Sequence, residues 1–242
     1  MMLPTNGPMR AIAAKLFAVS KDIEEAARRD YRKAPTSPAY WAMIDLKSSA
    51  VFRVDANDEQ AFARARAFSD LVARLAAWHE SFMIFKELGD GVLIRCSDFR
   101  ELLEAIVLLD AATHYWRVES DRDRNYPSLD SRTAITFGEC VELNGDYFGR
   151  PIDLVARLSA YSSSDHAYLA VVDDEVRIRN EARVQTEYPF IRFSDPIPVP
   201  AKLLKPNEKP GRVSEITIDR HAFGEFRDYF SSARKACEGG HV

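Results

Sequence analysis

The sequence has few cysteines, no excess of basic residues and no long hydrophobic run, and each deficit excludes a class of protein. Its three cysteines, Cys96, Cys140 and Cys237, are odd in number and lack the paired spacing of a zinc site. We therefore expect a reduced, cytoplasmic chain. The formal net charge of −4 argues against a protein that binds nucleic acid by neutralising its phosphates, although a local cluster of basic residues can still hold a single anionic ligand.

Signals for membrane insertion and export are also missing. No stretch approaches the roughly 18 uninterrupted apolar residues of a membrane span, and residues 1–10 hold no basic segment followed by an apolar core. We therefore expect neither a membrane anchor nor an export signal. The remaining composition, 46% hydrophobic and 29% charged over 242 residues, is that of a globular protein with one well-buried core.

The chain divides into an N-terminal segment and one domain. Apolar residues spaced by three and four predict an amphipathic helix over residues 8–31, within a segment 1–34. Such a helix is expected to pack on its own domain or across a dimer interface. Pro35 and Pro38 predict a break over residues 34–39, and a single domain follows over residues 39–242, with a strand and helix extension at its C-terminal end.

Strands and helices alternate along this domain. Apolar runs bounded by turn residues predict strands at 40–46, 81–85, 92–96, 132–137, 167–172, 176–178 and 188–193. Helical periodicity predicts helices at 57–79, 97–117, 151–158 and 220–235, with Ser97 as the cap of the second. Gly89-Asp90-Gly91 is typical of a hairpin turn, and Gly138 is expected to end its strand. We predict an α+β fold, a mixed and largely antiparallel sheet with helices packed on it.

Two carboxylates lie where predicted strands end. Asp45 closes a buried strand and Asp90 lies in the hairpin turn. If their strands are neighbours, the carboxylates repel each other unless a cation lies between them, and a few carboxylates with substrate phosphates are the usual ligands of Mg²⁺. Two such ions are the standard arrangement for in-line displacement at phosphorus. The alternative, that both merely cap backbone groups, stays open. Lys47, Ser48 and Ser49 follow Asp45 and can offer phosphate-binding donors.

The segment 145–158 combines a glycine-rich turn with the start of a helix. Pro151 suits a first helical turn, where its missing N–H costs nothing. Asp153 and Arg157 are four residues apart and share one helical face, and Asp146 precedes them. A surface ion pair is the simpler explanation of Asp153 and Arg157 taken alone.

Together these blocks resemble the catalytic domain of the class III nucleotidyl cyclases, the family of adenylyl and guanylyl cyclases. The likeness rests on residues 43–49, 85–91 and 132–158, and it spans about residues 40–174. The resemblance implies a ferredoxin-like core and a phosphorus–oxygen lyase that attacks the α-phosphorus of a nucleoside triphosphate with the ribose 3′ oxygen and releases pyrophosphate. It also implies two Mg²⁺ or Mn²⁺ ions per active site and a homodimer with two composite sites.

The resemblance assigns roles by position. Asp45 and Asp90 match the metal-binding aspartates of the family, with the carbonyl of Leu46 as a further ligand. Lys86 and Asp146 match the pair that recognises an adenine base.

Two helical residues complete the implied site. Arg157 matches the arginine that stabilises the transition state, and Asp153 stands where most members have an asparagine that orients the ribose. An acid there repels phosphate, so Asp153 must be paired, directed at a sugar hydroxyl, or not used. Arg150 and Arg157 are the expected partners.

Two features of the sequence favour different bases for the nucleotide substrate. Lys86 and Asp146 taken literally favour adenine. The layout, a cyclase core with a short N-terminal helix and no sensor or anchor, is similar to the stand-alone pyrimidine cyclases of the bacterial phage-defence systems called Pycsar, which make cyclic CMP or cyclic UMP for a separate effector. The layout favours UTP or CTP as substrate in antiviral defence, and an adenylate cyclase making cyclic AMP is the alternative.

Two functions from other classes are disfavoured. A catalytically inactive module that binds nucleotide or only dimerises has no need of Asp45, Asp90 and Arg157 together. A phosphatase or nuclease would be expected to place further His or Asp ligands near the two carboxylates.

Overall fold

The structure is a computed structural model that describes residues 21, 25, 36–47, 57–122, 129–143, 145–161, 166–171, 188, 190–208 and 211–219. Lys21 and Glu25 are helical and form an ion pair at 3.9 Å. The rest of the predicted N-terminal helix, the strand at 176–178 and the helix at 220–235 lie outside the described residues, as do Ser48 and Ser49.

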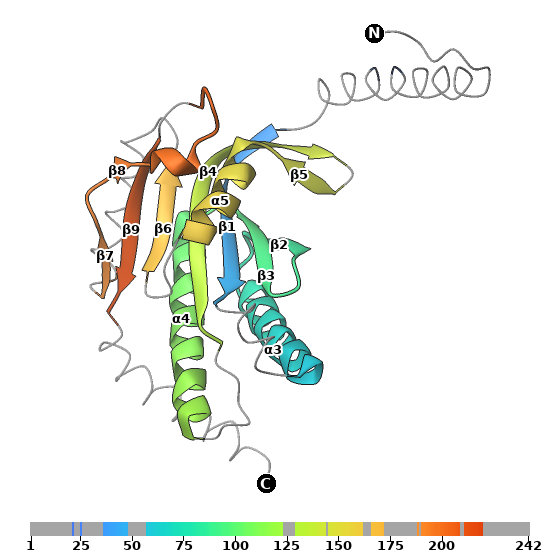
Figure 1. Cartoon of the computed structure of the whole chain (residues 1–242), viewed down its shortest axis with the longest axis vertical. Helices are drawn as coiled ribbons and strands as arrows, with labels where there is room; N and C mark the ends of the chain where they lie inside the picture. The colour runs from blue at the N-terminus through green and yellow to red at the C-terminus, as the bar shows by residue number, and fades with distance from the viewer. Residues whose placement is uncertain are drawn as a thin grey trace, which may run out of the picture.

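One sheet of nine strands is the framework of the described chain (Figure 1). Its main order is β2 (Phe82–Glu87), β3 (Gly91–Cys96), β1 (Thr36–Leu46), β4 (Ser131–Leu143), β6 (His166–Val171), β9 (Arg212–Ile218) and β7 (Ile191–Phe193). β5 (Asp146–Phe148) pairs with the end of β4, and β8 (Ile197–Pro198) pairs with β9. Among the described pairs, β4 and β6 alone run parallel. The predicted α+β fold with a largely antiparallel sheet is confirmed.

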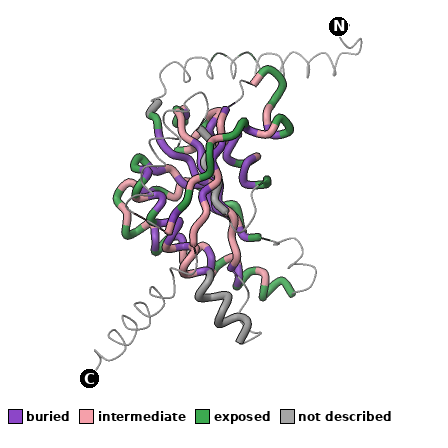
Figure 2. Tube along the Cα trace, turned by 90° about the vertical axis from the view of Figure 1, so that its left-hand side faces the viewer, coloured by how far each residue is buried: buried purple, intermediate pink, exposed green. Residues whose placement is uncertain are grey.

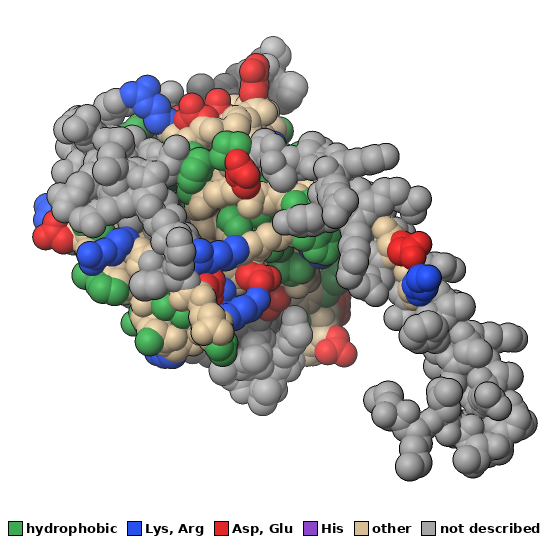
Figure 3. All heavy atoms as spheres, turned by 90° about the horizontal axis from the view of Figure 1, so that it is seen from above, with side chains coloured by type: hydrophobic (Ala, Val, Ile, Leu, Met, Phe, Trp, Pro, Cys, Tyr) green, Lys and Arg blue, Asp and Glu red, His purple; other side chains and the backbone are tan. Residues whose placement is uncertain are grey.

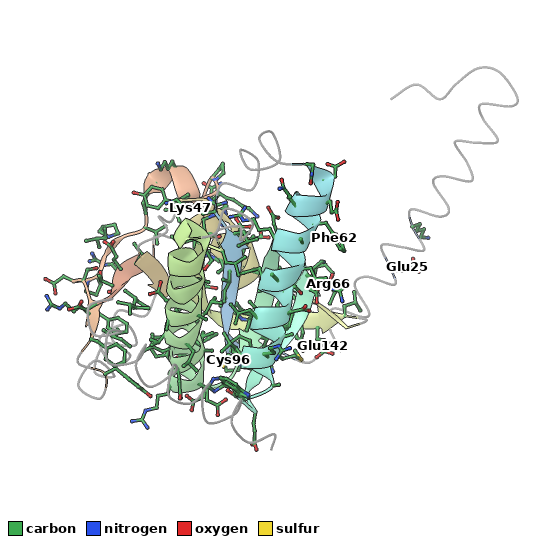
Figure 4. All side chains as sticks on the ribbon, turned by 90° about the horizontal axis from the view of Figure 1, so that it is seen from below. Glu25, Lys47, Phe62, Arg66, Cys96 and Glu142 are labelled. Atoms are coloured by element: carbon green, nitrogen blue, oxygen red, sulfur yellow. The ribbon has the colours of Figure 1, made fainter. Side chains whose placement is uncertain are left out.

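Helices cover both faces of this sheet. α3 (Asp58–Ala76) and α4 (Phe99–Arg122) lie side by side on one face (Figure 4), and α5 (Arg150–Tyr161) packs on the other. The alternation of side chains along β1 explains this arrangement. Tyr40 and Ile44 lie in the core with α3 and α4, whereas Met43 packs beside the apolar residues of α5. The buried residues therefore concentrate in the sheet and along the helix sides that face it (Figure 2).

Two predicted breaks lie inside strands. β1 begins at Thr36, within the break that the prolines predicted. Pro38 is tolerated because β3 pairs only with residues 40–45 of β1, so residues 36–39 are paired on the β4 side alone. β4 likewise continues through Gly138 to Leu143, and the prediction that it ends at Gly138 is wrong.

The ends of α4 also differ from the prediction. Its N-terminal cap is Asp98 and not Ser97, since Oδ1 of Asp98 accepts hydrogen bonds from the N–H groups of Arg100 and Glu101 at 2.7 and 3.2 Å. The helix runs to Arg122, five residues beyond the predicted end at residue 117. None of the described helices has the length and apolar character needed to cross a bilayer.

Three described strands, β5, β8 and β9, were not predicted, and the longest of them is β9. Its alternation is interrupted because Ser214 is fully buried, and its hydroxyl donates to the carbonyl of Ser194 at 2.6 Å. A polar residue in a buried position hides the period that identifies a strand.

Gly138 allows α5 to pack closely on β4. Its φ is +154°, and a Cβ at this position would lie 2.8 Å from Cγ of Pro151. Gly138→Ala is therefore expected to lower the free energy of unfolding by about 2–3 kcal/mol, because both the backbone and the rigid proline ring resist a methyl group. Urea denaturation followed by tryptophan fluorescence measures this loss.

Gly145→Ala is the matched control for that prediction. Gly145 also has a positive φ, +80°, but a Cβ there would meet nothing within 4 Å. Gly145→Ala should therefore lower the free energy of unfolding by about 1 kcal/mol, because only the backbone conformation opposes the methyl group. An equal decrease in the free energy of unfolding of the two variants would show that the close contact with Pro151 does not affect stability.

Candidate active site

β1 and the β2–β3 turn bring Asp45 and Asp90 together. Asp45 pairs with Gly91 in the β1–β3 ladder, and the N–H of Leu46 donates to the carbonyl of Asp90 at 2.8 Å. A Cβ at Gly91 would lie 3.1 Å from Oδ1 of Asp45 and 3.2 Å from the carbonyl of Ile44. Glycine at position 91 thus leaves room for the Asp45 carboxylate beside the turn.

Two arginines balance the charge of these carboxylates. Nε and Nη2 of Arg132 donate to Oδ2 of Asp45 at 2.9 and 2.6 Å. Burial nevertheless raises the pKa of Asp45 above its ordinary value, and the nearby charge of Asp90 raises it further, against the opposing effect of Arg132. Arg64 of α3 is only 5% exposed, and its Nη2 donates to the carbonyl of Lys47 at 2.7 Å. Sequence analysis identified neither arginine, since both lie far from Asp45 in the chain.

This arrangement fits a divalent cation. The carboxylates of Asp45 and Asp90 are hard oxygen ligands of the kind that Mg²⁺ and Mn²⁺ prefer, and the charge of Asp90 acts on Asp45. Within the described residues, no group of three or more His, Cys, Asp and Glu side chains is placed to hold a metal ion. An ion at Asp45 and Asp90 would therefore need further oxygen ligands from a substrate or water.

A second set of predicted residues lines a pocket of about 710 Å³ formed by β2, β5, the start of α5 and the loop 205–208. Lys86 and Asp146 are both in its wall, and Nζ of Lys86 lies 2.8 Å from Oδ2 of Asp146. The hydrogen bond from Lys86 lowers the pKa of Asp146. Asp153 lines the same pocket. The fold therefore brings together three residues that the sequence assigned to base and ribose.

Aromatic rings make the inner wall of this pocket rigid. Phe85 and Tyr147 line it, and their ring centroids lie 5.3 Å apart. Both pack against the buried Trp41, at 5.7 and 5.0 Å. The indole N–H of Trp41 in turn donates to the carbonyl of Gly138 at 2.9 Å. Three mutually packed rings leave this side of the pocket little freedom to adjust to a larger ligand.

Arg157 reaches the pocket through Glu208. Its Nη1 and Nη2 donate to the two carboxylate oxygens of Glu208 at 2.9 and 3.1 Å, and Nε of Arg150 donates to Oε1 at 3.0 Å. The Glu208 side chain is only 6% exposed. Burial would raise its pKa, but the hydrogen bonds from Arg157, the Lys205 N–H and Arg150 outweigh that effect and hold the pKa of Glu208 at about 2. Nothing in the sequence distinguishes Glu208 from other loop glutamates.

Asp153 is paired, though not with the residues that the sequence suggested. Its carboxylate binds Nζ of Lys205, because Arg150 and Arg157 are directed to Glu208. Arg157 contacts Asp153 only through the backbone, where its Nε donates to the Asp153 carbonyl at 3.1 Å. The expected pairing with Arg150 or Arg157 is therefore wrong, but the expected neutralisation by a cation is present.

The carboxylate pair and the pocket are separate within one chain. The pocket lining includes neither Asp45 nor Asp90. Trp41 precedes Asp45 by four residues, about 13 Å at 3.3 Å per residue, and the two share the α5 side of β1.

Seen from above, acidic and basic side chains lie next to one another on the described surface (Figure 3).

Sequence comparison finds one informative relative. A segment of 74 residues is 31% identical to the pH-sensitive adenylate cyclase of Mycobacterium tuberculosis. This match covers 31% of the chain and only 16% of the relative. No family model matches the chain.

Solved structures resemble the fold over most of its length. The guanylyl cyclase Cya2 superposes with a TM-score of 0.59 at 14% identity, covering 76% of this chain and 93% of that one. The adenylyl cyclase CyaB from P. aeruginosa gives 0.55 at 15% identity, over 76% and 96% of the two chains. An adenylate/guanylate cyclase/hydrolase from Silicibacter pomeroyi gives 0.52 at 21% identity, over 77% and 99%. The chain has the fold of the class III adenylyl and guanylyl cyclase catalytic domains.

Proposed function

We propose that the chain is a nucleotidyl cyclase, which converts a nucleoside triphosphate into a 3′,5′-cyclic nucleotide and pyrophosphate. The observation that carries the proposal is the joint presence, on a cyclase fold, of Asp45 beside Asp90 and of the Lys86–Asp146 pair in a pocket next to Arg157. A cyclase needs positioning and charge neutralisation more than a covalent nucleophile, and these residue types supply both.

The carboxylates would serve the reacting atoms. Asp45 and Asp90, with the carbonyl of Leu46, would hold two Mg²⁺ or Mn²⁺ ions. Such ions would lower the pKa of the ribose 3′ hydroxyl and neutralise charge at the phosphates. The hydrogen bonds from Arg132 keep the Asp45 carboxylate oriented at the end of β1. Lys47 is exposed and directly follows Leu46, and in this proposal it contacts a phosphate oxygen.

Arg157 and Asp153 would serve the phosphoryl group and the ribose. The planar guanidinium of Arg157 can direct two parallel N–H groups at oxygens on which charge develops. Asp153 lines the pocket with its charge balanced by Lys205, so its carboxylate can accept a hydrogen bond from a ribose hydroxyl without a net repulsion of phosphate.

The Lys86–Asp146 pair restricts the base. A lysine donor beside a carboxylate acceptor matches a base edge that presents a ring-nitrogen acceptor beside an amino group, and adenine and cytosine share that edge. The packed rings of Phe85 and Tyr147 favour the smaller base. We therefore propose a pyrimidine nucleotide, CTP before UTP, as substrate. ATP is the second candidate, because the same pair fits adenine and the sequence relative is named as an adenylate cyclase.

The separation of the two half-sites supports a homodimer. A second copy could bring its Asp45 and Asp90 to the pocket of the first, and two-fold symmetry would then create two identical composite sites. The product would act as a second messenger for a separate effector, and we propose phage defence as the setting.

The substrate can be identified directly. Purified protein is incubated with Mn²⁺ and each of the four nucleoside triphosphates, and products are identified by mass spectrometry. Cyclisation of CTP or UTP is expected to be at least about tenfold faster than that of ATP, a difference of about 1.4 kcal/mol in transition-state free energy. Lys86→Ala should reduce this preference, because it removes a donor to the base edge.

Lys202→Ala is the control, since Lys202 lies over the ring of Tyr161 outside the pocket lining. ATP as the best substrate would replace the pyrimidine proposal with an adenylate cyclase. Absence of a cyclic product with all four nucleotides would remove the cyclase proposal.

A further inference from the structure

Glu208 occupies the guanidinium groups that a phosphate would need. Its carboxylate accepts two hydrogen bonds from Arg157 and one from Arg150, and the N–H of Lys205 donates a fourth at 2.7 Å. A carboxylate offers about four lone-pair sites, so its accepting capacity is used. In this bidentate contact Glu208 binds both terminal nitrogens of Arg157. A guanidinium group binds phosphate through the same two nitrogens.

The bound glutamate belongs to a turn and not to the sheet. Glu208 lies between η2 (Ala201–Leu203) and β9, and its own N–H donates to the carbonyl of Lys205 at 3.0 Å. Asn207 has a φ of +66°, a conformation that asparagine tolerates in tight turns. Rotation of the Glu208 side chain would therefore break its contacts with both arginines without breaking any strand pairing.

Charge complementarity identifies the ligand that would displace it. With Glu208 in place, its carboxylate and that of Asp153 neutralise two of the three positive charges of Arg150, Arg157 and Lys205 at this side of the pocket. When Glu208 leaves, its negative charge no longer offsets the two guanidinium groups, and Arg150 lines the pocket. A chain of phosphates carries several negative charges and oxygen atoms in the required geometry.

We propose that Arg150 and Arg157 form a phosphate-binding site for the substrate, and that Glu208 is a built-in competitor that fills this site until a polyphosphate displaces it. This inference rests on the proposed function for the identity of the phosphate donor. It adds Arg150 as a phosphate-binding residue and Glu208 as a residue that weakens nucleotide binding. The observed affinity is the intrinsic affinity multiplied by the fraction of molecules in which Glu208 has left the arginines.

Binding of inorganic tripolyphosphate tests the site without the chemistry. Isothermal titration calorimetry of the full chain in metal-free buffer measures the dissociation constant. Glu208→Gln should bind tripolyphosphate at least about tenfold more tightly than the wild type, since an amide does not hold two guanidinium groups against an anion. Glu208→Asp keeps the charge but shortens the reach by one methylene, and it should give a smaller gain. Adding Arg150→Gln to Glu208→Gln should remove most of the gain.

Glu59→Gln is the matched control, because it removes the same charge from the first turn of α3, outside the pocket. Unchanged or weaker binding by Glu208→Gln, relative to this control, would overturn the proposal. Failure of both Glu208 variants to fold would also overturn it, since Glu208 would then be a structural part of the turn. Tighter tripolyphosphate binding without any cyclic product would retain the site and remove the cyclase function. Formation of a cyclic product without tighter tripolyphosphate binding by Glu208→Gln would retain the cyclase function and remove the proposed site.

Discussion

Asp45→Asn and Asp90→Asn are each expected to lower the rate of cyclisation by about 1,000-fold or more. Each substitution removes one of two adjacent carboxylates whose mutual repulsion a bound cation would relieve. Product formation at saturating Mn²⁺ measures the loss, and calorimetric titration with Mn²⁺ should show weaker metal binding in the same variants. Weaker Mn²⁺ binding in these variants would show that the lower rate of cyclisation arises from the metal site.

Asp70→Asn provides the control for charge, because Asp70 is an exposed residue of α3 whose ion-pair partner is Arg66. Thermal unfolding provides the control for folding, since Asp45→Asn leaves the Arg132 guanidinium without its charged partner. Near-wild-type turnover in either site variant would show that the carboxylates do not hold catalytic metal ions.

A mixture of Asp45→Asn and Arg157→Ala proteins is expected to recover activity that neither protein has alone. If each site takes its carboxylates from one protomer and its arginine from the other, a heterodimer has one intact site and one doubly altered site. Random exchange of protomers then predicts about a quarter of the wild-type rate. The measurement is product formation after mixing, with exchange followed by labelled protomers.

The matched control is a mixture of Asp45→Asn with Asp90→Asn. Both changes affect the same half-site, so every composite site in that mixture remains altered and no recovery is expected. A mixture of Asp45→Asn and Arg157→Ala that stays inactive after proven exchange would place the whole site within one chain.

Local patterns were sufficient to predict most elements around the site. The turn Gly89-Asp90-Gly91 predicted the β2–β3 hairpin because glycine accepts the positive φ of +81° found at Gly89. Pro151 predicted the first turn of α5, and helical periodicity predicted α3, although Arg64 and Val72 lie on its buried face beside Phe68 and Leu75. The positions of Asp45 at a strand end and Asp90 in a hairpin turn follow from the same local features, whereas their approach depends on the pairing of β1 with β3.

Elements and partners that depend on distant residues could not be predicted in this way. β9 was missed because the burial of Ser214 depends on a hydrogen bond to Ser194. Asp98 replaces Ser97 as the cap of α4, since either residue type can cap and only the path of the chain selects one.

The sequence by itself determined the alternation of strands and helices, the carboxylates at strand ends and the acid–arginine spacing on α5, because each follows from side-chain period and turn chemistry within a few residues. Only the tertiary structure decided which charges meet. Arg132 pairs with Asp45, Lys205 with Asp153, and Glu208 with Arg157. These partners are separated by about 50 to 90 residues in the chain, and strand order and the path of the 205–208 loop over α5 bring them together. A buried charge needs an opposite charge nearby, and the fold determines which one lies within reach.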